Sequence, residues 1–276
     1  MIVQKNRRSI FYQKSVDSII KDKNSTILIC GGGIFDKDTF QKLGFKNVTI
    51  SNLDVRMQGN EFEPFQWKYE NAEDLSFEDN YFDYVVIHAS IHHASSPHRV
   101  LTEMYRVAKK GILAIESRDS VIMRLLIKCG WTLNYEHEAV FHHECKYGGV
   151  NNTEIPNYIY RWTEREIEKT IQSYAPCFEH NFIYKYGYDF PFTPKKEKGG
   201  GSKYVILKIF EPFYKVFVKL FPKQQNLFSF YIEKPNSNNS LFTWLKIEDN
   251  GKITFNKEWA EQKYKSKKND FYNSTV

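Results

Sequence analysis

The chain has 276 residues, of which 41% are hydrophobic and 16% aromatic, and its formal net charge is +6. A chain with this apolar content can bury a large core, which excludes disorder over most of its length. Part of the positive charge lies in two short runs, residues 195–203 and 263–268. Because basic and aromatic residues do not combine on one identifiable module, we expect no nucleic-acid partner.

The four cysteines are scattered along the chain without CxxC spacing, and no secretory leader precedes them. This usage is typical of reduced thiols, so we expect a cytoplasmic protein.

The first predicted elements lead to a glycine turn. Residues 10–20 carry apolar side chains at near-helical spacing and predict a covering helix. A short apolar run at 27–30 then breaks into Gly31, Gly32 and Gly33, and a helical stretch at 36–43 leads to a β-rich run at 48–51 and Asp54. Glycines let the backbone approach a ligand, and an acid roughly 20 residues on can hold ribose hydroxyls. The stretch favours a nucleoside site, although a glycine turn after a buried strand is often only a turn.

Strands and helices alternate again between residues 71 and 116. Residues 84–88 form the near-continuous apolar run of a parallel strand. Ser96 and Pro97 predict a helix start, Gly111 predicts its end, and 112–115 predicts the next strand. This alternation predicts an α/β, Rossmann-like, doubly wound sheet with its ligands at the carboxyl ends of the strands.

Several motifs in this order resemble a known family. ILICGGG, Asp54, NAEDLSF, FDYVVIHASIHH and LTEMYRVAKKGILAIE are similar to motifs of the class I S-adenosylmethionine-dependent methyltransferases, in particular the type 11 group. The resemblance covers residues 26–116. It implies a mostly parallel seven-stranded sheet with helices on both faces and a terminal antiparallel hairpin, and it implies S-adenosyl-L-methionine as the cofactor.

The resemblance also implies roles for single residues. The glycines Gly31, Gly32 and Gly33 would face the methionine part of the cofactor, Asp54 would bind the ribose, and His88 would stand near the sulfonium. The residues expected along the adenine are Asn71, Ala72 and Glu73. The chain departs from the family at Ile29, where an acid is usual, at Phe35, where a third glycine is usual, and at Asn71, where an aspartate is usual.

Beyond Glu116 the resemblance fades, and the chain is expected to adapt to its substrate. Residues 121–127 predict a helix, and residues 131–161, rich in His, Tyr and Asn, predict a substrate lid. Thr163 and Glu166 form a capping box that predicts a helix over 164–174. Residues 178–186 and 227–232 suit the last two strands. We expect a methyltransferase domain over 1–233, with the lid and a 191–225 insertion, and a C-terminal extension over 234–276 with a hairpin at 244–255 and a frayed polar end.

The back half of the 191–225 insertion is a strongly apolar helix. Residues 204–221 are apolar except for Lys208, Glu211, Lys215 and Lys219, which share one narrow face. These charges and Pro212 argue against a membrane-spanning helix. The broad apolar face would pack on its own domain or on a second copy in a homo-oligomer, or would make a peripheral membrane contact.

Histidines gather where the methyl group is expected. Histidine is the natural general base near neutral pH, so His93, then His92 and His88, are the candidate catalytic residues, although each could simply pack. Glu116 could orient the substrate or be solvated. A second group of His, Glu and Cys at 137–145 matches no zinc-binding spacing, so we expect no metal.

These observations predict a methyltransferase that methylates an oxygen of a small polar acceptor, such as a sugar building block or a secondary metabolite. Two alternatives remain open. The chain could be a peripheral membrane methyltransferase of a lipid-linked acceptor, or a non-catalytic nucleoside-binding domain that serves as a partner in a complex.

Overall fold

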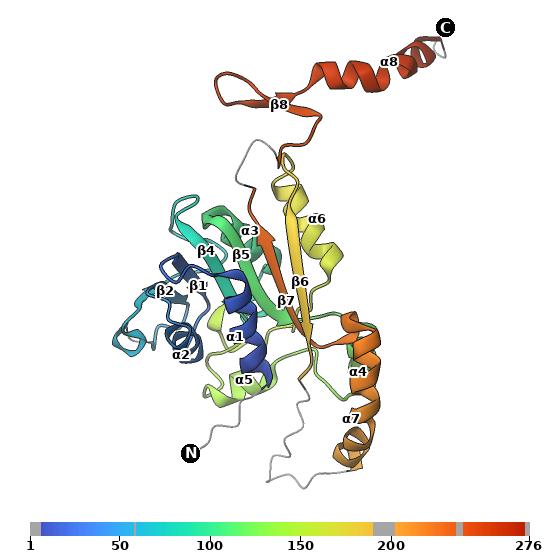
Figure 1. Cartoon of the computed structure of the whole chain (residues 1–276). Coiled ribbons are helices and arrows are strands. Elements are labelled where there is room, and N and C mark those ends of the chain that lie inside the picture. Colours follow the sequence, from blue (N-terminus) through green and yellow to red (C-terminus); the bar gives the residue numbers. More distant parts are fainter. Residues whose placement is uncertain (1–6, 58, 190–201, 236–239, 274–276) are drawn as a thin grey trace.

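The computed structural model describes residues 7–57, 59–189, 202–235 and 240–273. Its centre is one seven-stranded sheet with the strand order β3-β2-β1-β4-β5-β7-β6 (Figure 1). The strands are β1 (Thr26–Cys30), β2 (Asn47–Asn52), β3 (Gln66–Tyr69), β4 (Phe82–His88), β5 (Ala108–Ser117), β6 (Asn181–Gly187) and β7 (Leu227–Glu233). Strand β7 runs antiparallel to both β5 and β6, while β1 to β5 pair in parallel. The predicted mostly parallel seven-stranded sheet is confirmed.

Helices cover both faces of this sheet. The α-helices are α1 (Arg7–Ile19), α2 (Ile34–Lys42), α3 (Pro97–Val107), α4 (Val121–Lys128), α5 (His137–His142), α6 (Glu164–Tyr174), α7 (Ser202–Leu220) and α8 (Lys257–Asn273). Short 3-10 helices lie at η1 (Gly59–Phe62), η2 (Ile91–His93), η3 (Val150–Asn152) and η4 (Pro222–Gln224).

The core has two halves because successive strand residues point to opposite faces. Leu28 and Val85 lie on one face and pack with apolar side chains of α3 and α6. Ile27, Ile29 and Val86 lie on the other face and pack with side chains of α1 and α2. Burying a side chain of this size stabilises the fold by about 2 kcal/mol, so the near-continuous apolar strands fix the sheet in the middle.

Most predicted elements are present, and three differ. Gly111 was expected to end α3 but lies inside β5, because the backbone turns extended at Ala108 (φ −79°, ψ 140°). Strand β3 was not predicted, since as an edge strand with mostly exposed residues it lacks an apolar signal. The polar end expected to fray forms helix α8.

The C-terminal extension leaves the main body at the end of the sheet opposite to α5 (Figure 1). Strands β8 (Leu245–Ile247) and β9 (Ile253–Phe255) form the predicted hairpin. An isolated bridge between Phe178 and Leu241 ties the extension to the segment before β6. The front of the 191–225 insertion, residues 191–201, lies outside the described residues.

Helix α7 exposes most of its described apolar side chains. Val218 is buried, and Tyr214 donates its hydroxyl to the Gln224 carbonyl of η4 (3.1 Å). More than half of the side-chain surface is exposed at Ile209, Phe210, Phe213, Val216 and Leu220. Among the described helices, none combines the length and the apolar character that crossing a membrane requires.

Candidate active site

A cavity of about 250 Å³ opens at the carboxyl ends of β1, β2 and β4. Its wall combines the strand ends with the segment 131–161. Among the residues that line it are Gly31, Asn52, Leu53, Asp54, Arg56, Asn71, Ala72, Ile87, Ser90, His93, His143, Gly148, Gly149, Asn151 and Asn152. The sheet topology explains this place, because the connections of β1 and β4 run in opposite directions and leave a crevice between the strand ends.

Of the three predicted glycines, Gly31 alone lines the cavity. Its φ of +59° is a conformation that glycine adopts without strain, and an added Cβ would lie 2.7 Å from Cβ of Ser90. The hydroxyl of Ser90 donates to the Gly31 carbonyl (3.0 Å). Gly32 packs against the side chain of Ile50, since an added Cβ would lie 2.8 Å from its Cγ2, and Gly33 is the N-cap residue of helix α2. The first glycine therefore brings bare backbone to the cavity wall.

Asp54 lines the cavity just after β2, and Arg56 holds its carboxylate. Arg56 Nε donates to Oδ1 (2.8 Å) and Nη2 donates to Oδ2 (2.6 Å). Hydrogen bonding to Arg56 lowers the pKa of Asp54 below its usual value, so the carboxylate is ionised at neutral pH. The Arg56 guanidinium also lies over the ring of Tyr147, 4.2 Å from its centre. The pair therefore joins the end of β2 to the segment 131–161.

The loop between β3 and β4 brings Asn71 and Ala72, two of the residues expected along the adenine, to the cavity wall. Glu73 points elsewhere. Its carboxylate accepts the backbone N–H groups of Ser95 (3.2 Å) and Ser96 (2.7 Å), where α3 begins. A carboxylate at a helix start satisfies unpaired N–H groups and interacts favourably with the helix dipole. Glu73 therefore fixes α3 and does not line the cavity.

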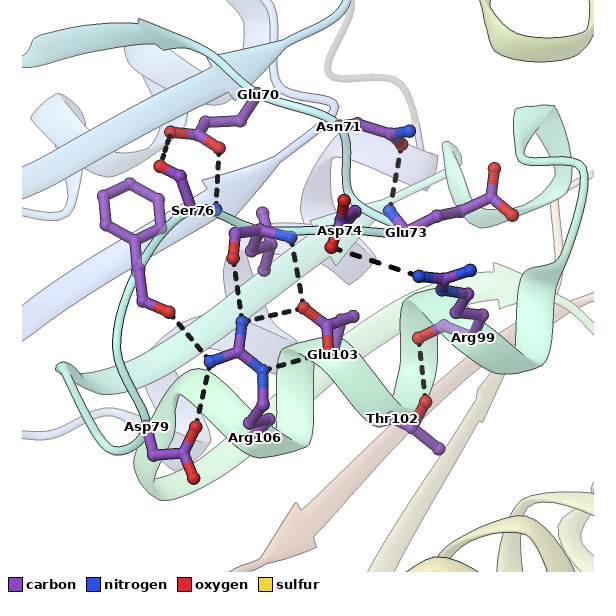
Figure 2. Close-up of polar contacts among 12 residues, drawn as sticks. Glu70, Asn71, Glu73, Asp74, Ser76, Asp79, Arg99, Thr102, Glu103 and Arg106 are labelled. Carbon is purple, nitrogen blue, oxygen red and sulfur yellow. Dashed lines mark hydrogen bonds and ion pairs between the residues drawn. The ribbon is translucent and has the colours of Figure 1, made fainter.

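Arg106 on α3 holds the rest of this loop (Figure 2). It donates to the carbonyls of Leu75 and Phe77 (2.8 Å each) and to the carboxylates of Asp79 (2.9 Å) and Glu103 (2.8 Å). Glu103 in turn accepts the Leu75 N–H (3.1 Å). The C-terminal end of α3, through Arg106 and Glu103, thus fixes the loop that carries Asn71 and Ala72.

His88, predicted beside the methyl group, lies in a different environment. Its ring stacks on Tyr12 of α1, with ring centres 4.2 Å apart and planes at 8°. Its Nδ1 is 3.8 Å from Oδ1 of Asp36, and burial lowers its pKa. Of the three candidate catalytic histidines, His93 is the one that lines the cavity, while His88 and His92 are not among the described residues that line it.

His92 and His93 form a charged cluster with two carboxylates. Glu116, whose side chain is fully buried at the end of β5, accepts His92 Nδ1 (2.8 Å) and the backbone N–H groups of Ser90 and Ile91 (2.9 Å each). Oε2 of Glu136 lies 3.3 Å from His92 Nε2 and 3.4 Å from His93 Nε2. The alternative of a solvated Glu116 is wrong, because the carboxylate is buried and holds three donors.

The cluster splits the pKa values of the two histidines. Burial disfavours the imidazolium of His92, but Glu116 and Glu136 together raise its pKa to about 10. Burial and the neighbouring His92 lower the pKa of His93. The hydrogen bond with His92 lowers the pKa of Glu136 to about 2. At neutral pH the cluster therefore presents a neutral His93 and an ionised Glu136.

The segment 131–161 covers the cavity from the side of Asp54. Asn151 Nδ2 donates to the Ser95 hydroxyl (2.7 Å), and Asn152 Nδ2 donates to the Leu53 carbonyl (3.4 Å). Gly149 fits a tight turn here, since an added Cβ would lie 1.9 Å from the carbonyl oxygen of Ile155. Of the histidines at 137–143, the one that lines the cavity is His143.

The profile of a protein family described as "Methyltransferase domain" matches residues 29–115. This match runs from β1 through His93 to the end of β5, the segment that builds most of the cavity. The chain carries a class I S-adenosylmethionine-dependent methyltransferase domain.

Solved structures of other proteins resemble the methyltransferase. The cyclase SpnF has a TM-score of 0.50 and 13% identity, with 83% of this chain and 82% of SpnF covered. At this identity the likeness shows the fold alone. A possible histamine N-methyltransferase from Thermotoga maritima (TM-score 0.47, 16% identity, 82% and 89% covered) and magnesium protoporphyrin IX methyltransferase from Synechocystis PCC 6803 with bound SAH (0.48, 12%, 85% and 88%) are also similar. No curated protein matches the chain.

The cavity of the methyltransferase has the groups that the cofactor requires. The ionised carboxylate of Asp54 keeps lone pairs that can accept ribose hydroxyls, although Arg56 uses part of them. The amide of Asn71 can donate and accept at an adenine edge, and Ile87 supplies an apolar wall. The bare backbone of Gly31 leaves room at the end of β1.

Two residues of the site had no usable sequence signal. Arg56 follows Asp54 in a stretch without periodicity, and Glu136 is one of four acids in the segment 131–161 with nothing in the sequence to single it out. Their roles depend on contacts with Tyr147, His92 and His93, which the fold brings together. Glu116 and Glu136 also lie beyond the matched residues 29–115.

Proposed function

We propose that the methyltransferase transfers a methyl group to an oxygen atom of a small polar acceptor, such as a sugar building block or a secondary metabolite. One observation carries this proposal. His93, neutral and next to the ionised Glu136, lines the same cavity as Gly31 and Asp54. An oxygen acceptor must lose a proton, and these two side chains can take part in removing it.

S-adenosylmethionine, when bound, supplies a methyl group on a sulfonium sulfur. As the bond from this methyl carbon to the acceptor oxygen forms, the bond from carbon to sulfur breaks and S-adenosylhomocysteine leaves. His93 receives the proton of the acceptor hydroxyl, the ionised Glu136 beside it stabilises the resulting imidazolium, and Glu116 keeps His92 in place. The covering segment orients the acceptor, and such positioning can supply several kcal/mol of the barrier reduction.

The chemistry of the cavity wall supports a polar acceptor. Asn151, Asn152 and His143 line the cavity from the covering segment, and each offers hydrogen-bonding groups. Hydroxyl groups of a sugar or of a hydroxylated metabolite can hydrogen-bond to such a wall.

The variant His93→Gln tests this proposal. We expect kcat for methyl transfer to fall roughly 100-fold, the usual loss for a missing proton acceptor, while the affinity for S-adenosylmethionine changes less than about twofold. The assay follows S-adenosylhomocysteine formation with a panel of sugar nucleotides and hydroxylated metabolites. The matched control is His142→Gln, because His142 is an exposed histidine of the covering segment 131–161 and is not among the described residues that line the cavity. Full activity of His93→Gln with an oxygen acceptor would contradict the proposal.

A second candidate is a lipid-linked acceptor reached from a membrane surface, which the exposed face of α4 and α7 favours. Gln224 of η4 joins the two helices, because its side chain accepts the Ile122 N–H (3.3 Å) and its carbonyl accepts the Tyr214 hydroxyl. Helix α4 adds the exposed apolar residues Val121 and Leu125 to those of α7, and the two helices and η4 also carry the exposed bases Arg124, Lys128, Lys219 and Lys223. Apolar residues with a basic rim suit an anionic lipid surface.

Vesicle flotation tests this second candidate. The wild-type chain is expected to float with vesicles that contain anionic lipid, and Phe213→Glu is expected to stay at the bottom of the gradient. Phe255→Glu, a similarly exposed position on β9, is the control. No flotation of the wild-type chain would exclude the membrane-bound form of the function.

A further inference from the structure

Three side chains at or near the cavity, those of His92, His93 and Glu136, bring their possible ligand atoms close together. One ligand atom each from His92, His93 and Glu136 lies within 4.8 Å of the other two. The histidines come from η2, directly after β4, and Glu136 comes from the covering segment. We propose that these three residues bind a divalent transition-metal ion of the Zn²⁺ type.

The two distances from Glu136 to the histidines fit a tetrahedral ion. With metal–ligand bonds of about 2.0–2.1 Å, two ligands of a tetrahedral ion lie about 3.3–3.4 Å apart. Oε2 of Glu136 is 3.3 Å from His92 Nε2 and 3.4 Å from His93 Nε2. Two histidines and a carboxylate leave the fourth position open, the composition that catalytic rather than structural zinc sites show.

The groups behind the ligands fit as well. Histidines that bind a metal almost always donate their other ring N–H to a carboxylate or a backbone carbonyl. His92 has Glu116 on Nδ1 at 2.8 Å, and two backbone N–H groups hold Glu116 in turn. The His92 ring is therefore oriented from behind.

A proton shared within the cluster accounts for the contacts of His92 alone. An imidazolium at His92 can donate one N–H to Glu116 and the other to Glu136. Nε2 of His93 also lies 3.4 Å from the same oxygen of Glu136. A cation bound between the two histidines and Glu136 would accept lone pairs from all three side chains and would explain why they converge.

The role of the ion deepens the proposed function and rests on it. His93 lines the cavity, so the open position would face the acceptor. An acceptor oxygen bound there would have a lower pKa, and its proton would pass to water. In this form of the function, His93 and Glu136 act on the acceptor through the ion instead of taking the proton themselves. Acceptors with a hydroxyl and a second oxygen nearby could then bind through both.

Metal titration of the tag-free full-length chain tests the proposal without any acceptor. After treatment with a chelator, the chain is titrated with Co²⁺ and followed by visible absorption, and bound Zn²⁺ is counted by atomic absorption after dialysis. We expect one ion per chain with the strong visible bands of a tetrahedral Co²⁺ site. His93→Ala and Glu136→Gln are expected to bind at least about 100-fold more weakly, and Glu116→Gln about 10-fold more weakly.

The matched controls are His137→Ala and His142→Ala, because both histidines are exposed on the segment 131–161 that also carries Glu136. Binding that falls equally in these controls, or wild-type binding no tighter than that of Glu136→Gln, would overturn the proposal. Circular dichroism shows whether each variant is folded. Methyl transfer that proceeds at full rate in chelator would overturn the metal's role and leave the proposed function standing. Failure to bind S-adenosylmethionine would overturn the proposed function and leave the metal titration unaffected.

Discussion

Arg118 and Glu164 form a buried ion pair behind the active site. The Nη2 of Arg118 lies 2.6 Å from Oε2 of Glu164, and the side chains are 9% and 11% exposed. Tyr186 of β6 donates its hydroxyl to the same carboxylate (2.6 Å), and Arg118 also donates to the Lys223 carbonyl of η4. Burial disfavours the carboxylate, but Arg118 and Tyr186 overcome this and lower the pKa of Glu164 to about 2. The pair joins the end of β5 to α6, β6 and η4.

This shift predicts a pH-dependent loss of stability. Because the folded-state pKa lies below the unfolded value near 4.5, the stabilisation is complete above pH 4.5 and disappears as the pH falls toward 2. We expect Glu164→Gln to lower the free energy of unfolding by roughly 3 kcal/mol at pH 7. Urea unfolding from pH 7 to pH 2.5 measures it, with exposed Glu154→Gln as the control. A wild-type–variant difference that stayed constant with pH would refute this account.

At the scale of an element, helix α3 holds the loop between β3 and β4, which carries Asn71 and Ala72. Arg106 donates to two loop carbonyls and two carboxylates, while Arg99, about two turns earlier on the same helix, only approaches Asp74 at 4.0 Å (Figure 2). The Arg106 side chain is 22% exposed and that of Arg99 is 62% exposed. A buried cation that satisfies carbonyls contributes far more than an exposed ion pair.

We therefore expect Arg106→Ala to lower the free energy of unfolding by about 3 kcal/mol and to weaken S-adenosylmethionine binding several-fold, because Asn71 and Ala72 lose their support. Arg99→Ala should change neither quantity measurably. Thermal unfolding and calorimetric titration of both variants make the comparison. Equal behaviour of the two variants would show that the loop does not depend on Arg106.

Elements with a local cause were predicted from the sequence. The capping-box pattern at Thr163 predicted α6. In the structure the Thr163 hydroxyl accepts the Glu166 N–H (3.3 Å) at the start of this helix. The apolar runs at 27–30 and 84–88 predicted β1 and β4. Edge strand β3 and Gly111 within β5 were not predicted, because pairing with neighbours decides them rather than periodicity. The cavity follows the same division. Gly31 and Asp54 follow strands that were predicted, and Asn71 and Ala72 were expected from the family resemblance, whereas Glu136 acts across a long-range contact.

At the scale of the whole molecule, the sheet and the C-terminal extension are separate pieces of structure. The extension meets the body through backbone bonds of residues 177–179 with 240–242, among them Glu179 N–H to the Ser240 carbonyl (2.8 Å). Its hairpin packs on its own residues, with the Phe242 and Trp244 rings stacked 4.3 Å apart. All the described residues that line the cavity lie before β6.

A chain that ends at residue 235 is therefore expected to fold and to bind S-adenosylmethionine within about twofold of the full-length value, because neither core half includes residues of the extension. Thermal unfolding and titration of the shortened chain test this expectation. Loss of the cooperative transition would show that the sheet needs the extension.

The central claim is that the cavity at Gly31 and Asp54 binds S-adenosylmethionine. Calorimetric titration of the purified chain with S-adenosylmethionine and S-adenosylhomocysteine tests it most directly, repeated with Asp54→Ala and with Asp38→Ala, an exposed acid of α2. We predict micromolar binding, about −8 kcal/mol, that weakens roughly 10- to 100-fold in Asp54→Ala and is unchanged in Asp38→Ala. No binding of either compound by the folded chain, or full affinity in Asp54→Ala, would contradict the account.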